Sequence, residues 1–138
     1  MRKRTKAREY VLQMLYQVDI TKGDWQDIFE NFWESKEHED FSEELKDFSA
    51  QLLKGAVEHS QEIDKKISLY AANWELERMA FVDRNIMRLG CFELLFREDI
   101  PPKVAINEAV ELAKKYSGSE SGKFVNARLD KIKIEKEK

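Results

Sequence analysis

The sequence predicts an all-α protein of a single domain. Only five glycines and two prolines occur among its 138 residues, well below the usual combined share of about 12%, so the chain lacks the turn residues that many short strands need. Charged residues make up 37% and apolar residues 42%, a balance that suits helices with wide solvated faces. A chain of this length buries roughly 70% of its unfolded surface and needs no disulfide or metal to hold its core.

Apolar residues at helical spacing predict three helices in the first part of the chain. The first spans about residues 5–19, and the second, about 24–35, begins at Asp24. The third begins at Ser42 and carries apolar residues as far as Val57. Two acidic residues follow Ser42, and acids in a first turn favour the helix dipole.

Four further helices are expected at about 60–72, 80–96, 103–116 and 122–134. Apolar residues nearly encircle the helix at 80–96, so it should be the central one. Pro101 and Pro102 break the chain before the next helix, because proline cannot continue a helix. We expect a loop of small residues at 117–122 and a frayed tail from Glu135.

Few residues in this chain suit metal, disulfide or nucleophile chemistry. A single cysteine excludes a disulfide framework within the chain and every multi-cysteine zinc site. Cys91 lies in the apolar helix without an adjacent histidine or lysine, so we expect it to be buried and inert. His38 and His59 form no ligand cluster and are expected to be surface histidines. The sequence therefore predicts no metal and no cofactor.

The segment from Gly118 to Lys123 looks like half of a phosphate-binding loop. It has three residues between its glycines where the nucleotide-binding motif needs four, and Phe124 stands where that motif needs serine or threonine. It also follows a helix, whereas the motif follows a strand. Nucleotide hydrolysis is therefore excluded, although the start of the last helix, with Lys123, could bind one phosphate.

The charge of the chain is concentrated at its start. Residues 1–8 hold no acid and five cations, Arg2, Lys3, Arg4, Lys6 and Arg8. We expect all five to lie outside the apolar core. Residues 19–64, by contrast, hold fourteen acids and four lysines. A basic end on an acidic body indicates a nucleic-acid contact, because phosphate binding depends on local charge density. The alternative is a basic tail that serves only solubility.

The basic start does not look like a targeting signal. No apolar run of signal-peptide length follows it, and no stretch approaches the roughly 18 apolar residues of a membrane span. We therefore expect a cytoplasmic protein with no membrane partner, and a single cysteine fits that reducing compartment.

Four blocks of sequence carry a resemblance to a known family. They are Arg4–Tyr16, Phe81–Phe96, Ile100–Lys114 and Gly122–Asp130. In this order they closely resemble the NusB family of bacterial transcription antitermination factors. The resemblance covers essentially the whole chain and is strongest over residues 78–130, whereas residues 20–60 match only in their helical pattern.

The resemblance implies an all-helical fold of two small bundles, no enzymatic activity and no cofactor. It implies binding of boxA-type single-stranded RNA together with NusE, which is also a protein of the small ribosomal subunit. It further implies action on RNA polymerase, within the antitermination complex that supports ribosomal RNA transcription.

The same resemblance implies the site residues. The positions that match RNA-binding parts of the family are Arg2, Lys3, Arg4, Lys6, Arg8, Asp83, Arg88, Lys123 and Phe124. Tyr16 matches a position on the side of the first helix that faces NusE. The chain departs from the family pattern at Asn126–Ala127–Arg128, which concerns the packing of the last helix.

Two other functions are weighed against this one. The same helical fold occurs as the N-terminal domain of a ribosomal RNA cytosine methyltransferase, but that enzyme needs a second, nucleotide-binding domain, for which 138 residues leave no room. The other is a helical scaffold that binds protein only, without specific RNA recognition. Whether the free protein is a monomer or a homodimer stays open.

Overall fold

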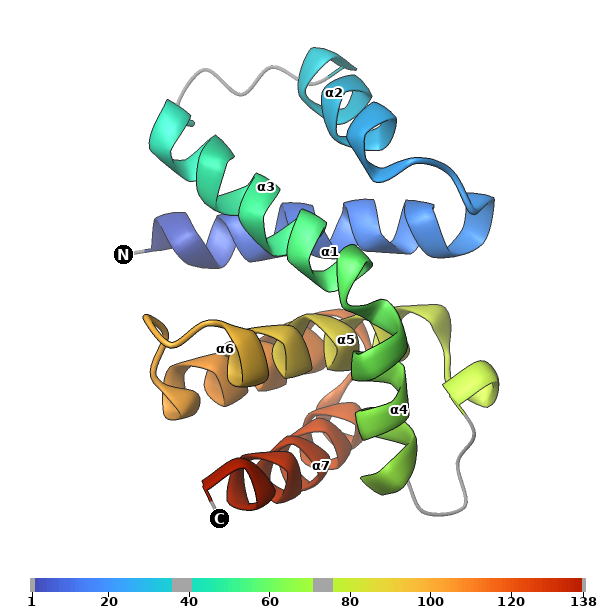
Figure 1. Ribbon diagram of the computed structural model, residues 1–138, viewed down its shortest axis with the longest axis vertical. Coiled ribbons are helices and arrows are strands. Elements are labelled where there is room, and N and C mark those ends of the chain that lie inside the picture. Colours follow the sequence, from blue (N-terminus) through green and yellow to red (C-terminus); the bar gives the residue numbers. More distant parts are fainter. Residues whose placement is uncertain (1, 36–40, 71–75, 138) are drawn as a thin grey trace. The chain divides into compact units, whose positions relative to one another are not determined.

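The computed structural model describes residues 2–35, 41–70 and 76–137. These ranges contain seven α-helices, one short 3-10 helix and no strand (Figure 1), which confirms the predicted all-α class. The chain forms two compact units, residues 1–58 and 59–138. No helix in the described ranges has the length and apolar character needed to cross a bilayer.

The first unit holds three helices: α1 (Arg2–Thr21), α2 (Trp25–Ser35) and α3 (Glu43–Glu58). The residues predicted to open the second and third helices do so. The carboxylate of Asp24 accepts a hydrogen bond from the backbone N–H of Gln26 at 2.7 Å, and the Ser42 hydroxyl accepts one from Leu45 N–H at 3.2 Å. Both bonds satisfy N–H groups that have no partner inside the helix.

An aromatic cluster joins the helices of the first unit. The ring of Tyr10 on α1 meets Phe32 of α2 edge-on, with 5.1 Å between the ring centroids, and meets Phe41, just before α3, at 5.3 Å. Trp33 contacts the same three rings. Such edge-to-face pairs add to the free energy gained by burying the rings, so this cluster fixes α1 against α2 and the start of α3.

The second unit holds four α-helices and the 3-10 helix: α4 (Ser60–Tyr70), η1 (Leu76–Arg78), α5 (Phe81–Phe96), α6 (Pro102–Tyr116) and α7 (Ser119–Glu137). Helix α5 contacts α4, α6 and α7, which confirms the prediction that it is central. Ten of the eleven residues from Arg84 to Leu94 are buried, all except Arg88, so α5 is buried on every side along this stretch. The predicted end of α4 at 71–72 lies outside the described residues.

The prediction of a loop at 117–122 is wrong. Helix α7 begins at Ser119, and only Ser117 and Gly118 connect it to α6. Gly118 takes a φ of 116°, in the left-handed region that favours glycine, and its N–H donates to the carbonyl oxygen of Ala113 at 2.9 Å. Gly122 lies where a Cβ atom would come within 2.9 Å of Cγ of Lys114. Here, therefore, the second glycine reflects close packing of two helices and not a loop.

The prediction of a frayed tail from Glu135 is also wrong, because α7 continues to Glu137. The carboxylate of Glu135 accepts hydrogen bonds from the Lys66 ammonium and the Tyr70 hydroxyl of α4. These hydrogen bonds raise the pKa values of both Lys66 and Tyr70. Lys136 Nζ donates to the carbonyl oxygen of Leu94 at 2.7 Å. Contacts with α4 and α5 thus hold the last turn of α7 in place.

The packing of α5 is tightest at Gly90. A Cβ atom at this position would lie 2.8 Å from Cδ1 of Leu129 on α7 and 3.1 Å from Cβ of Ala109 on α6. Both distances are shorter than ordinary van der Waals contact between carbon atoms. The absence of a side chain at Gly90 therefore lets three helices meet.

We predict that Gly90→Ala destabilises the protein. Alanine gains about 1 kcal/mol of helix propensity over glycine, but overpacking a tight core costs about 1–3 kcal/mol. We expect a net loss of about 1 kcal/mol, measured as the free energy of unfolding in urea. An increase in stability, as expected for a solvent-exposed helical glycine, would contradict this account of the packing.

Candidate nucleic-acid interface

The basic start of the chain forms the first two turns of α1. Lys3, Arg4 and Lys6 have exposed side chains, whereas Arg8 is buried, with 3% of its surface exposed. Arg2 lies in the helix, but its side chain is outside the described part of the structure. The expectation that all five cations lie outside the apolar core is therefore wrong for Arg8.

Arg4 and Arg8 both lie over the ring of Phe48 on α3. Their Cζ atoms are 4.1 and 5.4 Å from the ring centroid. The two arginines are one helical turn apart, so they project from the same face of α1, and each is attracted to the negative face of the ring. These contacts attach the first turns of α1 to α3 and offset the penalty for cations at a helix N-terminus.

The accessible cations of this segment are Lys3, Arg4 and Lys6. Lys6 Nζ is 3.8 Å from the carboxylate of Glu9 and 5.2 Å from the ring centroid of Tyr10, yet the lysine side chain is half exposed. An exposed ion pair contributes little to stability. Lys6 is therefore available to an anionic partner at small cost, as are Lys3 and the outer part of Arg4.

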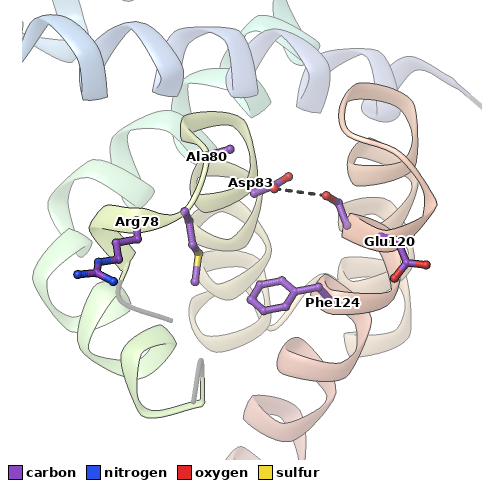
Figure 2. Close-up of a pocket in the computed structure, with 7 residues that line it drawn as sticks. Arg78, Ala80, Asp83, Glu120 and Phe124 are labelled. Carbon is purple, nitrogen blue, oxygen red and sulfur yellow. Dashed lines mark hydrogen bonds between the residues drawn. The ribbon is translucent and has the colours of Figure 1, made fainter. Parts of the chain in front are cut away.

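A second candidate site lies in the other unit, where a cavity of about 330 Å³ opens beside α5 and α7 (Figure 2). Its lining residues come from η1, the start of α5 and the start of α7: Arg78, Met79, Ala80, Asp83, Glu120, Ser121 and Phe124. Sites for small ligands start at about 300 Å³, so the cavity suits a ligand of the size of one nucleotide. Of the residues predicted from sequence, the cavity brings together Asp83 and Phe124.

Asp83 has one carboxylate oxygen without a partner. Its Oδ2 accepts a hydrogen bond from the Ser121 hydroxyl at 3.3 Å, and a dashed line marks this bond in Figure 2. Its Oδ1 is buried and accepts no hydrogen bond from the described residues. A buried acceptor left in this state costs about 1–3 kcal/mol. A ligand that offers an N–H or O–H group would remove that cost.

Phe124 forms part of the cavity wall and is half-buried. Figure 2 shows its ring extending from α7 toward the segment that carries Arg78. Neighbouring Lys123 is exposed, with Nζ 3.6 Å from the carboxylate of Glu120. A half-buried ring beside an accessible cation can stack on a base while the cation meets a phosphate.

Arg88 does not line the cavity. Its guanidinium forms a two-pronged ion pair with Asp64 on α4, with Nε to Oδ1 at 2.9 Å and Nη2 to Oδ2 at 3.1 Å. A third hydrogen bond joins Nη1 to Asn85. These bonds fix α5 to α4, and a role of Arg88 in RNA binding stays a prediction.

Tyr16 lies on an exposed part of α1. It is 38% exposed, and Ile20, one turn later, is 47% exposed. Two large side chains spaced by four residues share one face of a helix, so they form an apolar strip on the surface. Ile20 is not among the residues predicted from sequence, although its spacing from Tyr16 is a readable signal.

The remaining candidates carry no chemistry in the described structure. Cys91 is fully buried, which confirms that part of the prediction. Burial raises the pKa of its thiol to about 12, which disfavours the reactive thiolate. His59 is half-buried, and one face of its ring stacks on Phe96 with 4.1 Å between centroids. His38 lies outside the described residues. Within the described part of the chain, no three potential ligands gather to hold a metal ion.

Comparison with known proteins points to one family. The sequence model of the NusB family matches residues 5–133. The chain is 46% identical to the transcription antitermination protein NusB of Thermodesulfovibrio yellowstonii over 138 aligned positions, which cover 94% of this chain and 91% of the relative. It is 47% identical to NusB of Anaeromyxobacter dehalogenans, over 94% of this chain and 89% of that protein.

Solved structures give the same result. The NusB structure from T. maritima superposes with a TM-score of 0.87 at 38% sequence identity and covers 96% of this chain, which in turn covers 91% of it. NusB in a crystal structure of antitermination factors NusB and NusE with double-stranded RNA superposes with a TM-score of 0.85 at 30% identity, over 97% and 98% of the two chains. Sequence and structure together show that this chain belongs to the NusB family.

Proposed function

We propose that this transcription antitermination factor binds boxA-type single-stranded RNA together with the ribosomal protein NusE, as part of the RNA polymerase complex that transcribes ribosomal RNA. It does so in the cytoplasm, where bacterial transcription takes place. It acts by binding and not as an enzyme, in keeping with its family. The observation that carries the RNA part of the proposal is the cavity lined by both Phe124 and Asp83, whose Oδ1 accepts no hydrogen bond from the described residues.

The cavity matches the chemistry of an unpaired base. Proteins read single-stranded RNA by stacking aromatic side chains on splayed bases and by hydrogen bonds to base edges. Phe124 supplies a ring, and Asp83 supplies an acceptor for an exocyclic amino group such as that of cytosine. A nucleobase offers both a flat face and an N–H edge, which a simple anion does not.

The accessible cations supply the phosphate contacts. Lys3, Arg4 and Lys6 in the first unit and Lys123 in the second are exposed. Phosphate contacts raise affinity for any sequence, whereas base contacts select the sequence. The two units thus contribute different parts of RNA binding.

NusE is the protein partner we propose for the strip formed by Tyr16 and Ile20. A relative of 30% identity has been solved with NusE and double-stranded RNA. Tyrosine is enriched among the residues that dominate protein interfaces, because its ring buries a large area at low entropic cost. A homodimer is the alternative occupant of this strip.

The first prediction from the proposed function concerns salt. If the four accessible cations Lys3, Arg4, Lys6 and Lys123 meet phosphates of single-stranded RNA, the slope of log K against log salt is about −3. Raising salt from about 50 to 200 mM then weakens binding about 50-fold. Fluorescence anisotropy with a labelled boxA RNA measures this slope. A slope near zero would leave the protein-only scaffold as the better function.

A second prediction separates the RNA contact from the fold. Lys3→Gln combined with Lys6→Gln should make the slope shallower by about 1.4 without lowering the unfolding temperature, because both side chains are exposed and oppose the helix dipole. The matched control, Lys54→Gln with Lys103→Gln, removes two exposed cations elsewhere and should leave RNA binding unchanged.

Deleting residues 1–8 is a poorer test of the same contact, because it also removes buried Arg8 and Ala7. We expect this truncation to unfold at a lower temperature. A truncated protein that melts like the full chain would contradict the role given to the contacts of Phe48 with Arg4 and Arg8.

The third prediction concerns the partner. Tyr16→Asp should weaken NusE binding by about 2 kcal/mol, or about 30-fold, in isothermal titration calorimetry. Tyr116→Asp is the matched control, since Tyr116 on α6 is 41% exposed. Size-exclusion chromatography of both variants tests the homodimer: loss of a dimer in Tyr16→Asp with NusE binding intact would reassign the strip to self-association.

A further inference from the structure

Arg128 lies where the chain departs from the sequence pattern of its family, on the face of α7 that carries Phe124. The two residues are one helical turn apart. The Cζ atom of Arg128 is 4.6 Å from the centroid of the Phe124 ring. The guanidinium therefore covers one face of a ring that also lines the cavity.

This guanidinium lacks the partners that other arginines of the same unit have. Arg88 and Arg97 each form a two-pronged ion pair, with Asp64 and Asp99. Within the described part of the chain, Arg128 forms no ion pair, and its Nε is buried without a hydrogen bond. Burial of a charged donor without a partner is costly, so packing alone is a poor reason for an arginine at this position.

The Arg128 side chain is accessible to a ligand. Arg128 is only half-buried, so the outer end of its guanidinium stays within reach of solvent. A guanidinium can stack on an aromatic ring through its plane and bind a phosphate through its edge at the same time. A base stacked on the open face of Phe124 would place its own backbone phosphate near this edge.

We infer that Arg128 is a further RNA-binding residue: it stacks on Phe124 and binds the phosphate of the nucleotide whose base enters the cavity. This inference rests on the proposed RNA-binding function. It assigns a binding role to a residue that sequence analysis related only to the packing of the last helix.

The test compares Arg128→Met, which keeps the length and apolar stem but removes the charge, with Arg128→Lys and with Lys103→Met as the matched control. Lys103 is exposed at the start of α6, at the other end of that helix from the connection to α7. Affinity for single-stranded boxA RNA is measured from about 50 to 200 mM salt, and thermal unfolding is recorded for every variant.

We expect Arg128→Met to weaken binding about ten-fold at low salt and to make the salt slope shallower by about 0.7, the value for one phosphate of single-stranded RNA. Arg128→Lys should keep the slope but not the full affinity, because lysine retains the charge without the planar stack. Lys103→Met should match the unsubstituted protein in both.

Three results would overturn the inference. Arg128→Met with unchanged affinity and slope would show that the arginine does not touch RNA. Weaker binding with an unchanged slope would show that it only holds the Phe124 ring. If Arg128→Met does not fold, Arg128→Lys with both full affinity and an unchanged slope would count against the stacked guanidinium. No RNA binding by the unsubstituted chain would instead overturn the proposed function itself.

Discussion

The close approach of α5 and α7 at Gly90 determines where the cavity lies. Leu129 of α7 occupies the space that a side chain at position 90 would fill. Asp83 lies two turns before Gly90 on α5, and Phe124 lies a little over one turn before Leu129 on α7. The contact between Gly90 and Leu129 therefore sets the distance between α5 and α7 in the preceding turns, where the Ser121 hydroxyl donates a hydrogen bond to Asp83. The geometry of the candidate site therefore depends on core residues that do not line the cavity.

The basic start of the chain links RNA binding to the stability of the first unit. Its cations repel one another and oppose the helix dipole, and among its described side chains Arg4 and Arg8 contact Phe48. An anionic ligand on Lys3 and Lys6 relieves the remaining repulsion, and a ligand that binds only the folded form stabilises it. This segment is thus part of the folded structure as well as of the proposed interface, which a solubility tail would not be.

Local sequence signals predicted much of the fold and less of the site. The starts of α2 and α3 at Asp24 and Ser42 and the central place of α5 follow from neighbouring residues and from periodicity. The continuation of α7 past Glu135 depends on Lys66 and Tyr70, which are more than sixty positions away, and no local pattern reports such contacts. For the same reason the sequence could not show that Phe124 and Asp83 would line one cavity or that Arg8 would be buried. The family resemblance gave Asp83 and Phe124 as site residues, but it did not give their geometry.

Selectivity for one RNA sequence has to come from the second unit. The exposed cations of α1 are flexible point charges or stacked arginines that meet phosphates, and phosphates are the same in every sequence. The Asp83 carboxylate is held in place by the hydrogen bond that its Oδ2 accepts from Ser121. Its Oδ1 can accept a hydrogen bond only from a donor group, which the edges of some bases present and others lack. A base without that donor would leave the oxygen buried and unpaired, and would lose the free energy of a hydrogen bond to a charged group. In the proposed function the first unit therefore raises affinity for RNA in general, and the Asp83 carboxylate is the group proposed to choose among bases.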